Sequence, residues 1–228
     1  MFIGHFAVGF AAKRVAPRAS LAALFAAVQL ADVLWPVFVA TGLEQVRIRP
    51  GDTPFTPLEF VSYPYSHSLI ALAGWGCLFG AVYMTRASGG VRSLVLMASL
   101  VVSHWLLDFV SHRPDMPIVP GGTKFGLGLW YSVPGTIAVE SGMFAVSVWI
   151  YVRVTRARDA VGRWALAALI ALLAIAYAGN ILGGPPPSVE AIWIAGLAGA
   201  ALILMLSWWA DSHREPALVP AEVTVPGR

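Results

Sequence analysis

The sequence predicts an all-α, polytopic integral membrane protein, and three observations lead to this fold class. Of the 228 residues, 58% are hydrophobic and only 12% are charged, whereas a typical soluble domain carries about 25% charged residues. The mean hydropathy is +0.73. A membrane-spanning helix needs about 20 apolar residues to cross a hydrocarbon core of about 30 Å. Six runs reach this length: 19–41, 66–86, 91–112, 134–153, 162–183 and 189–210.

The same composition excludes several other classes of protein. Disordered chains and collagen-like repeats do not contain so many apolar residues. Cys77 is the only cysteine, so an intramolecular disulfide is impossible. No run of basic residues is dense enough to indicate a nucleic-acid partner, and membrane lipid is the expected partner instead. We expect one transmembrane helical domain over residues 1–212, followed by a polar C-terminal tail over residues 213–228.

The first predicted element, residues 1–12, precedes these spans. It does not fit a secretory signal, because its charges, Lys13 and Arg14, follow the apolar stretch instead of preceding it. At about 1.5 Å per residue, this helix reaches only about half-way across the bilayer. Two arrangements are open: a re-entrant segment buried against the other helices, or an amphipathic helix lying on the inner membrane surface.

The linkers between the spans predict the orientation. Linkers 86–92 and 151–163 are short and basic, whereas linkers 43–65 and 113–133 are longer and rich in Pro and Gly. When Lys and Arg are assigned to alternate sides, eleven of the 15 fall on the side of the two termini. The positive-inside rule then places both termini in the cytoplasm. The opposite side holds Arg47, Arg49, Arg113 and Lys124.

Ionisable residues inside the predicted spans indicate a functional site, because each costs about 2.5–3.5 kcal/mol within a membrane. The span 91–112 carries His104, Asp108 and His112 at a spacing of four residues, which places them on one face of the helix. Imidazole and carboxylate groups at this spacing can bind the same metal ion. Other spans contribute Asp32, His67 and Glu140.

Helix depth brings these residues to a similar level. At about 1.5 Å per residue, Asp32 and His104 both lie about 18 Å from the inner ends of their helices. His67 and Glu140 belong to the outer half, and His5 joins them only if residues 1–12 are re-entrant. Because zinc sites are usually four-coordinate, this larger set favours two or three zinc ions, although manganese or iron would accept the same ligands. Each residue alone also fits a plainer role, such as a hydrogen bond between helices, a helix cap or a solvated interface position.

Short segments of this chain resemble motifs of the YdjM-like family, bacterial membrane proteins described as metal-dependent hydrolases. Tyr65-Ser66-His67-Ser68-Leu69 looks like the family's Thr-His-Ser-Leu segment. Ser103-His104-Trp105-Leu106-Leu107-Asp108 looks like its Ser-His-Leu-Leu-Leu-Asp segment. Gly4-His5 resembles its N-terminal His. Ala31-Asp32-Val33-Leu34-Trp35-Pro36 takes the place of its Asp-rich segment, although this chain has a single Asp there.

This resemblance covers roughly residues 1–140, and the last two spans match nothing in the family. The family is distantly akin to zinc-dependent phospholipase C enzymes, which bind three zinc ions through His, Asp and Glu. By that similarity the expected metal ligands are His5, Asp32, His67, His104 and Asp108, with His112 and Glu140 as weaker additions.

The resemblance and the residue pattern together predict a hydrolase of phosphoesters, with a lipid-linked or head-group substrate, in the bacterial inner membrane. A metal-activated water would be the nucleophile in the extracytoplasmic half, with Asp108 or Glu140 orienting it or taking its proton. Two groups of residues on the outer side would receive a phosphate or an anionic head group, unless they are ordinary loop charges: Arg47 and Arg49, and Arg113 and Lys124.

Two other classes of protein stay open at this point. An ion, proton or metal transporter also places His and Asp inside the membrane, but the sequence shows no internal repeat of the kind that transporters carry. A non-catalytic membrane protein with a structural metal site would use a closed four-ligand site. Serine and cysteine hydrolases are disfavoured, because Cys77 has no base nearby and no Gly-x-Ser-x-Gly segment is present.

Overall fold

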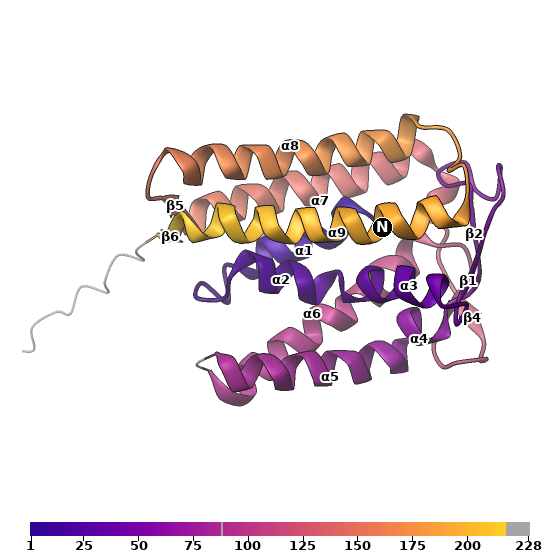
Figure 1. The fold of residues 1–228 in the computed structure, drawn as a ribbon, viewed down its shortest axis with the longest axis horizontal. Coiled ribbons are helices and arrows are strands. Elements are labelled where there is room, and N and C mark those ends of the chain that lie inside the picture. The colour runs from indigo at the N-terminus through magenta and orange to yellow at the C-terminus, as the bar shows by residue number, and fades with distance from the viewer. Residues whose placement is uncertain (88, 218–228) are drawn as a thin grey trace, which may run out of the picture.

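The structure, a computed structural model, describes residues 1–87 and 89–217. The described helices include five that are long and apolar enough to span a membrane, and they run roughly along the long axis of the molecule (Figure 1). These are α5 (Leu69–Arg86), α6 (Gly90–Ser111), α7 (Val133–Val154), α8 (Ala160–Leu182) and α9 (Val189–Ser212). The predicted all-α, polytopic membrane fold is therefore confirmed.

The first predicted span, residues 19–41, is broken in two. Its halves, α2 (Leu21–Val28) and α3 (Leu30–Ala40), meet at an angle of 55°. The backbone departs from helical geometry at Gln29, where φ is −104° and ψ is 8°. The break places Asp32 in the first turn of α3, and it leaves the carbonyl of Val28 available to a neighbouring helix.

The N-terminal helix α1 (Ile3–Ala12) lies inside the bundle. It packs against α7, α2 and α6, and most of its side chains are buried, with Phe10 wholly inaccessible. Figure 1 shows α1 behind α9 and surrounded by other helices. The structure therefore favours the re-entrant arrangement of residues 1–12 over a helix on the membrane surface, and it brings His5 into the interior.

Short strands and helices close the two ends of the bundle. At one end, the long linkers form the antiparallel pairs β1–β2 and β3–β4, together with the short helices α4 and η1. At the other end β5 pairs with β6, so the predicted polar tail begins with a paired strand; residues 218–228 lie outside the described residues. The bounds are β1 Gln45–Ile48, β2 Leu58–Ser62, α4 Pro64–His67, β3 Met116–Pro117, β4 Lys124–Phe125, η1 Leu129–Tyr131, β5 Thr155–Ala157 and β6 Arg214–Pro216.

Two hydrophobic cores hold the helices together. One core joins α2 and α3 to α5 and α6, with Leu72 and Met97 at its centre. The other joins α1 and α2 to α7, α8 and α9, with Phe25 and Leu169 fully buried. Because α2 contributes to both cores and α1 contacts both α6 and α7, the region between these helices is where polar residues of the two halves meet.

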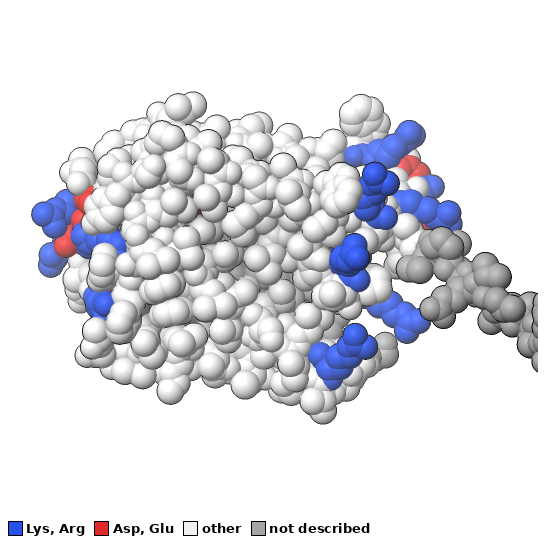
Figure 2. Space-filling view, turned by 180° about the vertical axis from the view of Figure 1, so that it is seen from behind, with Lys and Arg blue, Asp and Glu red and all other residues white. Residues whose placement is uncertain are grey.

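The outer surface of the bundle is apolar between two charged ends. Figure 2 shows a broad band without Lys, Arg, Asp or Glu on the face that it draws, and basic residues at both ends, more of them at the end that carries β5 and β6. The long helices expose apolar side chains to the surroundings, among them Leu78, Val95, Val146, Ile175 and Leu202. Such a band would be unstable in water and suits the hydrocarbon core of a membrane.

Candidate metal centre

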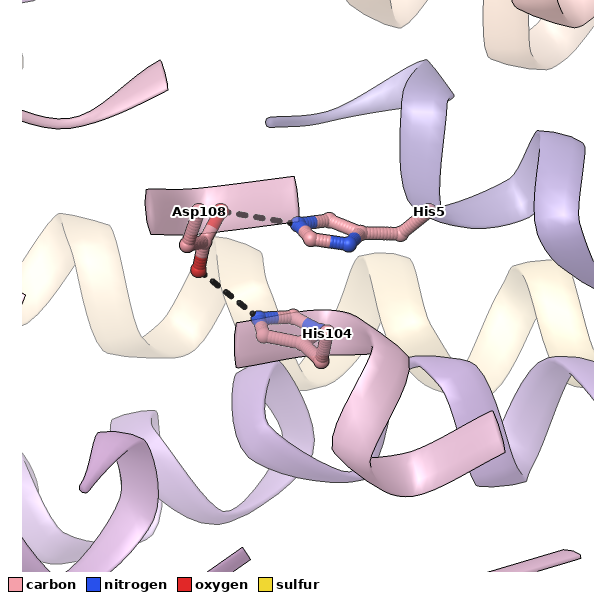
Figure 3. Close-up of side chains that lie close together, drawn as sticks. All are labelled: His5, His104 and Asp108. Carbon is pink, nitrogen blue, oxygen red and sulfur yellow. Dashed lines mark hydrogen bonds and ion pairs between the residues drawn. The ribbon is translucent and has the colours of Figure 1, made fainter. Parts of the chain in front are cut away.

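Imidazole and carboxylate side chains meet in the interior, where α1, the α2–α3 break, α4 and α6 approach one another. Two sets of residues each place one ligand atom per residue within 4.8 Å of the others. His5, His104 and Asp108 form the first set, which Figure 3 shows with His5 from α1 and the other two residues from α6. Asp32, His67 and His104 form the second, so His104 links the two.

The carboxylate of Asp108 lies at the middle of the centre. Its Oδ1 atom is 3.0 Å from Nε2 of His5, and its Oδ2 atom is 3.1 Å from Nε2 of His104. Two further imidazoles approach it at 3.8 Å: Nε2 of His67 faces Oδ2, and Nε2 of His112 faces Oδ1. The amine of Met1 also contacts Oδ1, so a positive charge lies beside this carboxylate.

The carboxylate of Asp32 approaches the same imidazoles from the other side. Its Oδ1 atom lies 3.5 Å from Nε2 of His67 and 3.7 Å from Nε2 of His104. The side chain of Asp32 is 38% exposed, whereas the side chains of His67, His104 and Asp108 are at most 4% exposed. Asp32 is therefore the carboxylate through which the centre meets open space.

The Nδ1 atoms of three imidazoles are held by hydrogen bonds that point away from Asp32 and Asp108. Nδ1 of His104 donates to the Val28 carbonyl at 2.8 Å, since a carbonyl can only accept. The Ser66 hydroxyl donates its proton to Glu44, so its oxygen accepts from Nδ1 of His67 at 2.7 Å. Nδ1 of His112 lies 3.0 Å from the Asp115 carboxylate and donates to it.

In the neutral imidazoles these hydrogen bonds keep the proton on Nδ1 and leave a lone pair on Nε2 of His67, His104 and His112. A lone pair facing a carboxylate oxygen is repulsive unless a proton or a metal cation lies between the two atoms. Nε2 of His104 lies 3.1 Å from Oδ2 of Asp108, and a proton or a metal cation between these two atoms would join them. The geometry thus accommodates a metal cation at this point.

The spacing of the atoms also fits a metal. The Nε2 and carboxylate oxygen atoms are 3.0–3.8 Å apart. In a tetrahedral zinc site with bonds of about 2.0–2.1 Å, neighbouring ligand atoms lie about 3.3 Å apart. Mixed imidazole and carboxylate donors are a set that zinc accepts, and manganese and iron accept it too.

Glu140 anchors the helix that carries His5. Its Oε2 atom accepts the backbone N–H groups of Phe2 at 2.8 Å and Gly4 at 3.1 Å, so its negative charge lies at the N-terminus of α1, where it is favourable. Its other oxygen, Oε1, is buried without a hydrogen-bond partner. The ring of His5 stacks on that of His104, with centroids 3.7 Å apart. Glu140 lies outside both sets of clustered ligands.

His112 ends α6 and belongs to a second polar network just beyond the helix. Asp115 accepts hydrogen bonds from His112, Tyr63 and Arg113. Burial opposes ionisation of Asp115, but these hydrogen bonds outweigh it and hold the pKa of the carboxyl below its ordinary value. Burial and the nearby Asp115 raise the pKa of Tyr63 well above 10. His112 lies outside the two clustered sets, and this network sets its orientation.

The four basic residues expected to bind a phosphate lie around the linker end of the bundle. Arg47 and Lys124 are exposed, and Lys124 donates to a backbone carbonyl at 3.3 Å. Arg49 lies 3.4 Å from Glu59. Arg113 is half-buried and pairs with two carboxylates, Asp52 and Asp115. The contacts of Arg49, Arg113 and Lys124 are with carboxylates or a backbone carbonyl of the chain itself, and the role of the four residues in binding a substrate stays a prediction.

Sequence reasoning missed the residues that hold the imidazoles. Glu44 and Asp115 lie in linkers, and Ser66 is a neighbour of His67 in the sequence. The three-residue interval between His112 and Asp115 was a usable signal, because residues so spaced meet at a helix end. No signal in the sequence pointed to Glu44, whose contact with Ser66 depends on how the linker folds.

Comparisons with known proteins add no homologue. No family model, no curated protein and no solved structure matches the chain. The resemblance to the YdjM-like family therefore stays a prediction, and the functional argument depends on the geometry of the centre.

Proposed function

We propose that the chain is a membrane-embedded, metal-dependent hydrolase of phosphoesters. The observation that carries this proposal is the arrangement of His67, His104 and His112, whose Nδ1 atoms are held from behind while their Nε2 lone pairs face Asp32 and Asp108. Hydrogen bonds of this kind orient metal-binding histidines in proteins. A centre that only joined helices would not need two carboxylates and several imidazoles in contact.

The residues divide naturally between two metal positions. His5, His104 and Asp108 would hold one ion, and Asp32 and His67 would hold a second one beside His104. Zinc is the preferred metal, and manganese or iron would fit the same donors. A bound divalent ion would lower the pKa of water and polarise a phosphoryl oxygen.

Among the carboxylates, Asp32 is placed best to handle a proton. Its side chain is 38% exposed, so water can reach it, whereas Asp108 is enclosed by imidazoles. Oε2 of Glu140 already accepts two backbone N–H groups, so only its Oε1 atom is left for the predicted role of orienting or deprotonating the water. In this proposal Asp32 binds the second ion through one oxygen and accepts a proton from water through the other, Asp108 binds the first ion, and Glu140 positions α1.

The proposed setting is the bacterial inner membrane, with both termini in the cytoplasm. The excess of basic residues at the end that carries β5 and β6 supports this orientation (Figure 2). The centre would then open toward the extracytoplasmic side, because α4 and the C-terminal end of α6 lie at the end formed by the long linkers (Figure 1).

Metal content tests the first half of the proposal. The protein would be purified in detergent without added metal, beside His104→Ala and a control, His213→Ala, whose imidazole pairs with Asp159 outside the centre. We expect one or two equivalents of zinc, manganese or iron in the wild type and in the control, and a loss in His104→Ala. A folded wild type without metal would refute the proposal.

Hydrolysis tests the second half. The metal-loaded protein would be assayed with p-nitrophenyl phosphate and with a short-chain phosphatidylglycerol. We expect phosphoester cleavage that stops when a chelator removes the metal and that falls strongly in Asp32→Asn. Bound metal without any phosphoester cleavage would instead identify a structural metal site.

A further inference from the structure

A large cavity adjoins the metal centre. It has a volume of about 660 Å³ and lies among α1, α3, α8, α9 and the linkers around Phe55 and Trp130. This volume is in the range of ligand-binding pockets, about 300–1,000 Å³. Asp32 belongs both to the centre and to the lining of the cavity. Because the other clustered ligands are almost inaccessible, the cavity is the route by which a substrate would reach them.

The cavity is kept open by small residues on the last two helices. Gly179 on α8 and Gly199 on α9 both line it, and a Cβ atom added at either would meet no atom within 4 Å. Glycine within a helix costs about 1 kcal/mol relative to alanine. The space beside these two glycines is therefore part of the cavity, and larger side chains at these positions would fill it.

The dimensions of the cavity suit a hydrocarbon chain. Its lining residues on α9 run from Ala191 to Leu204, which is about 20 Å of helix. One leaflet of a membrane contributes about 15 Å of hydrocarbon, half of the core of about 30 Å. The walls are mainly apolar, with Phe6, Ile192 and Ile203 among the lining residues. An extended acyl chain therefore fits along α9.

The lining of the cavity also includes polar groups. Trp35, Trp130 and Gln29 line the cavity, and within residues 1–87 and 89–217 a buried polar atom of each has no hydrogen-bond partner: the two indole N–H groups and the amide oxygen. All three side chains are more than nine-tenths buried. Buried polar groups normally have partners. Two N–H donors in the lining that also contains Asp32 suit the oxygen atoms of a head group that a metal would also attract.

We propose that this cavity binds one acyl chain of a phospholipid whose phosphate head lies at Asp32 and the metal centre. The proposal depends on the function proposed above and names its substrate class: a lipid phosphoester that enters from the membrane. It also gives a role to α8 and α9, which supply no ligand to the clustered sets.

The test is the binding of a single-chain lipid, oleoyl lysophosphatidate, measured by native mass spectrometry of the full-length protein. Gly199→Leu would fill the cavity, and Gly74→Leu is the matched control, because a Cβ at Gly74 also meets no atom within 4 Å but lies on α5, away from the cavity. We expect the wild type and the control to bind the lipid, and Gly199→Leu to bind it about ten-fold more weakly or less. Metal content should be unchanged in all three.

A second arm separates a lipid from a free phosphate. Butyl phosphate carries the same head chemistry without a long chain, and we expect it to compete poorly with oleoyl lysophosphatidate in the wild type. Equal competition would overturn the proposal in favour of a site for small phosphates. If Gly199→Leu does not fold, Gly179→Val fills the same cavity from α8.

The outcomes separate this proposal from the hydrolase proposal. Lipid binding by Gly199→Leu equal to that of the wild type overturns the acyl-chain site, whether or not the protein contains metal. Loss of lipid binding in Gly199→Leu, in a protein that contains no metal, supports the acyl-chain site while refuting the metal-dependent hydrolase.

Discussion

The partner of each Nδ1 atom decides which imidazole nitrogen is free to bind a cation. At His67 that partner is the Ser66 hydroxyl, which donates to Oε2 of Glu44 at 2.6 Å. Glu44 is itself fixed, because its Oε1 accepts the backbone N–H groups of Tyr65 and Ser66. This chain of hydrogen bonds turns Nε2 of His67 toward Asp32. The orientation of His67 thus depends on a carboxylate in the linker before β1.

We predict that Ser66→Ala weakens metal binding by about 10–100-fold, the usual effect of removing the group that orients a ligand. The methyl group cannot accept the Nδ1 proton of His67, so the ring loses its fixed tautomer and position. A competition titration with a chelator would measure the affinity. Ser103→Ala is the control, because Ser103 neighbours His104 but its hydroxyl donates to the Leu100 carbonyl of its own helix. Equal affinities in Ser66→Ala and Ser103→Ala would contradict the role of the hydrogen bond.

At the scale of single residues, the four-residue spacing within a helix predicted more of the metal centre than the neighbouring residues in the sequence did. His104 and Asp108 are four residues apart on α6, so the sequence alone places them on one face. In the structure Nε2 of His104 lies 3.1 Å from Oδ2 of Asp108. His5 needed a buried N-terminal helix, which the sequence left open. Glu44 lay beyond prediction, because a linker residue reaches Ser66 only through the tertiary fold.

Helices α5 and α6 form a tight antiparallel pair that depends on glycine. A Cβ atom at Gly80 would lie 2.6 Å from the Leu94 carbonyl oxygen, and one at Gly76 would lie 3.0 Å from that of Ala98. Both neighbours are backbone atoms of α6, so the helices would have to separate to make room. Close approach of this kind is how apolar helices associate within a membrane.

We predict that Gly80→Ala destabilises the protein by about 1–3 kcal/mol, the usual cost of overpacking. Gly74→Ala on the same helix is the matched control, since its Cβ would meet no atom within 4 Å. That control should be neutral or stabilising by up to about 1 kcal/mol, because alanine favours helix more than glycine does. Thermal unfolding in detergent would measure both variants. A Gly80→Ala protein as stable as the control would show that the two helices have room to move apart.

A buried ion pair joins the first helix to the last one. Lys13, which follows α1, donates to both oxygens of Asp211 on α9 at 2.8 and 2.7 Å. Tyr151 also donates to this carboxylate at 2.6 Å, and the Leu21 backbone N–H does so at 3.0 Å. The lysine is therefore not a free surface charge but part of the interior contact that holds α1 in the bundle.

We predict that Lys13→Met destabilises the protein by about 3–5 kcal/mol, because it leaves the buried Asp211 without its cation. The double variant Lys13→Met/Asp211→Leu should recover much of this loss, since no unpaired charge then stays in the interior. Thermal unfolding in detergent would compare the two. A double variant no more stable than Lys13→Met would mean that Tyr151 and Leu21 depend on Asp211 more than Lys13 does.

At the scale of helices, hydropathy predicted the long elements and missed their interruptions. The four spans from 91–112 to 189–210 agree with α6 to α9 within a few residues. The break at Gln29 had no signal, because glutamine is an ordinary helix former and Pro36 lies seven residues further along. His67 also proved to lie in α4, a separate short helix before α5. Both interruptions adjoin the metal centre, where tertiary contacts outweigh local helix preference.

Over the whole molecule, the centre lies where the two hydrophobic cores meet. The sequence predicted that the polar residues share a depth, but it could not predict which helices are neighbours. The contact of α1 with both α6 and α7 brings His5 to Asp108 and Glu140 to the start of α1. The cavity beside Asp32 was likewise beyond prediction, because its walls come from α3, α8 and α9 together.

The orientation of the whole molecule is tested by labelling single cysteines. In a Cys77→Ala background, Leu127→Cys lies at the linker end and Val15→Cys at the opposite end, and both positions are more than 60% exposed. Because the sequence assigns eleven of the 15 Lys and Arg to the side of Val15, the positive-inside rule predicts that this side is cytoplasmic. We predict that a membrane-impermeant maleimide labels Leu127→Cys in intact spheroplasts and labels Val15→Cys only after lysis. The opposite pattern would place the opening of the metal centre at the cytoplasmic face, and its lipid substrate would then have to come from the inner leaflet.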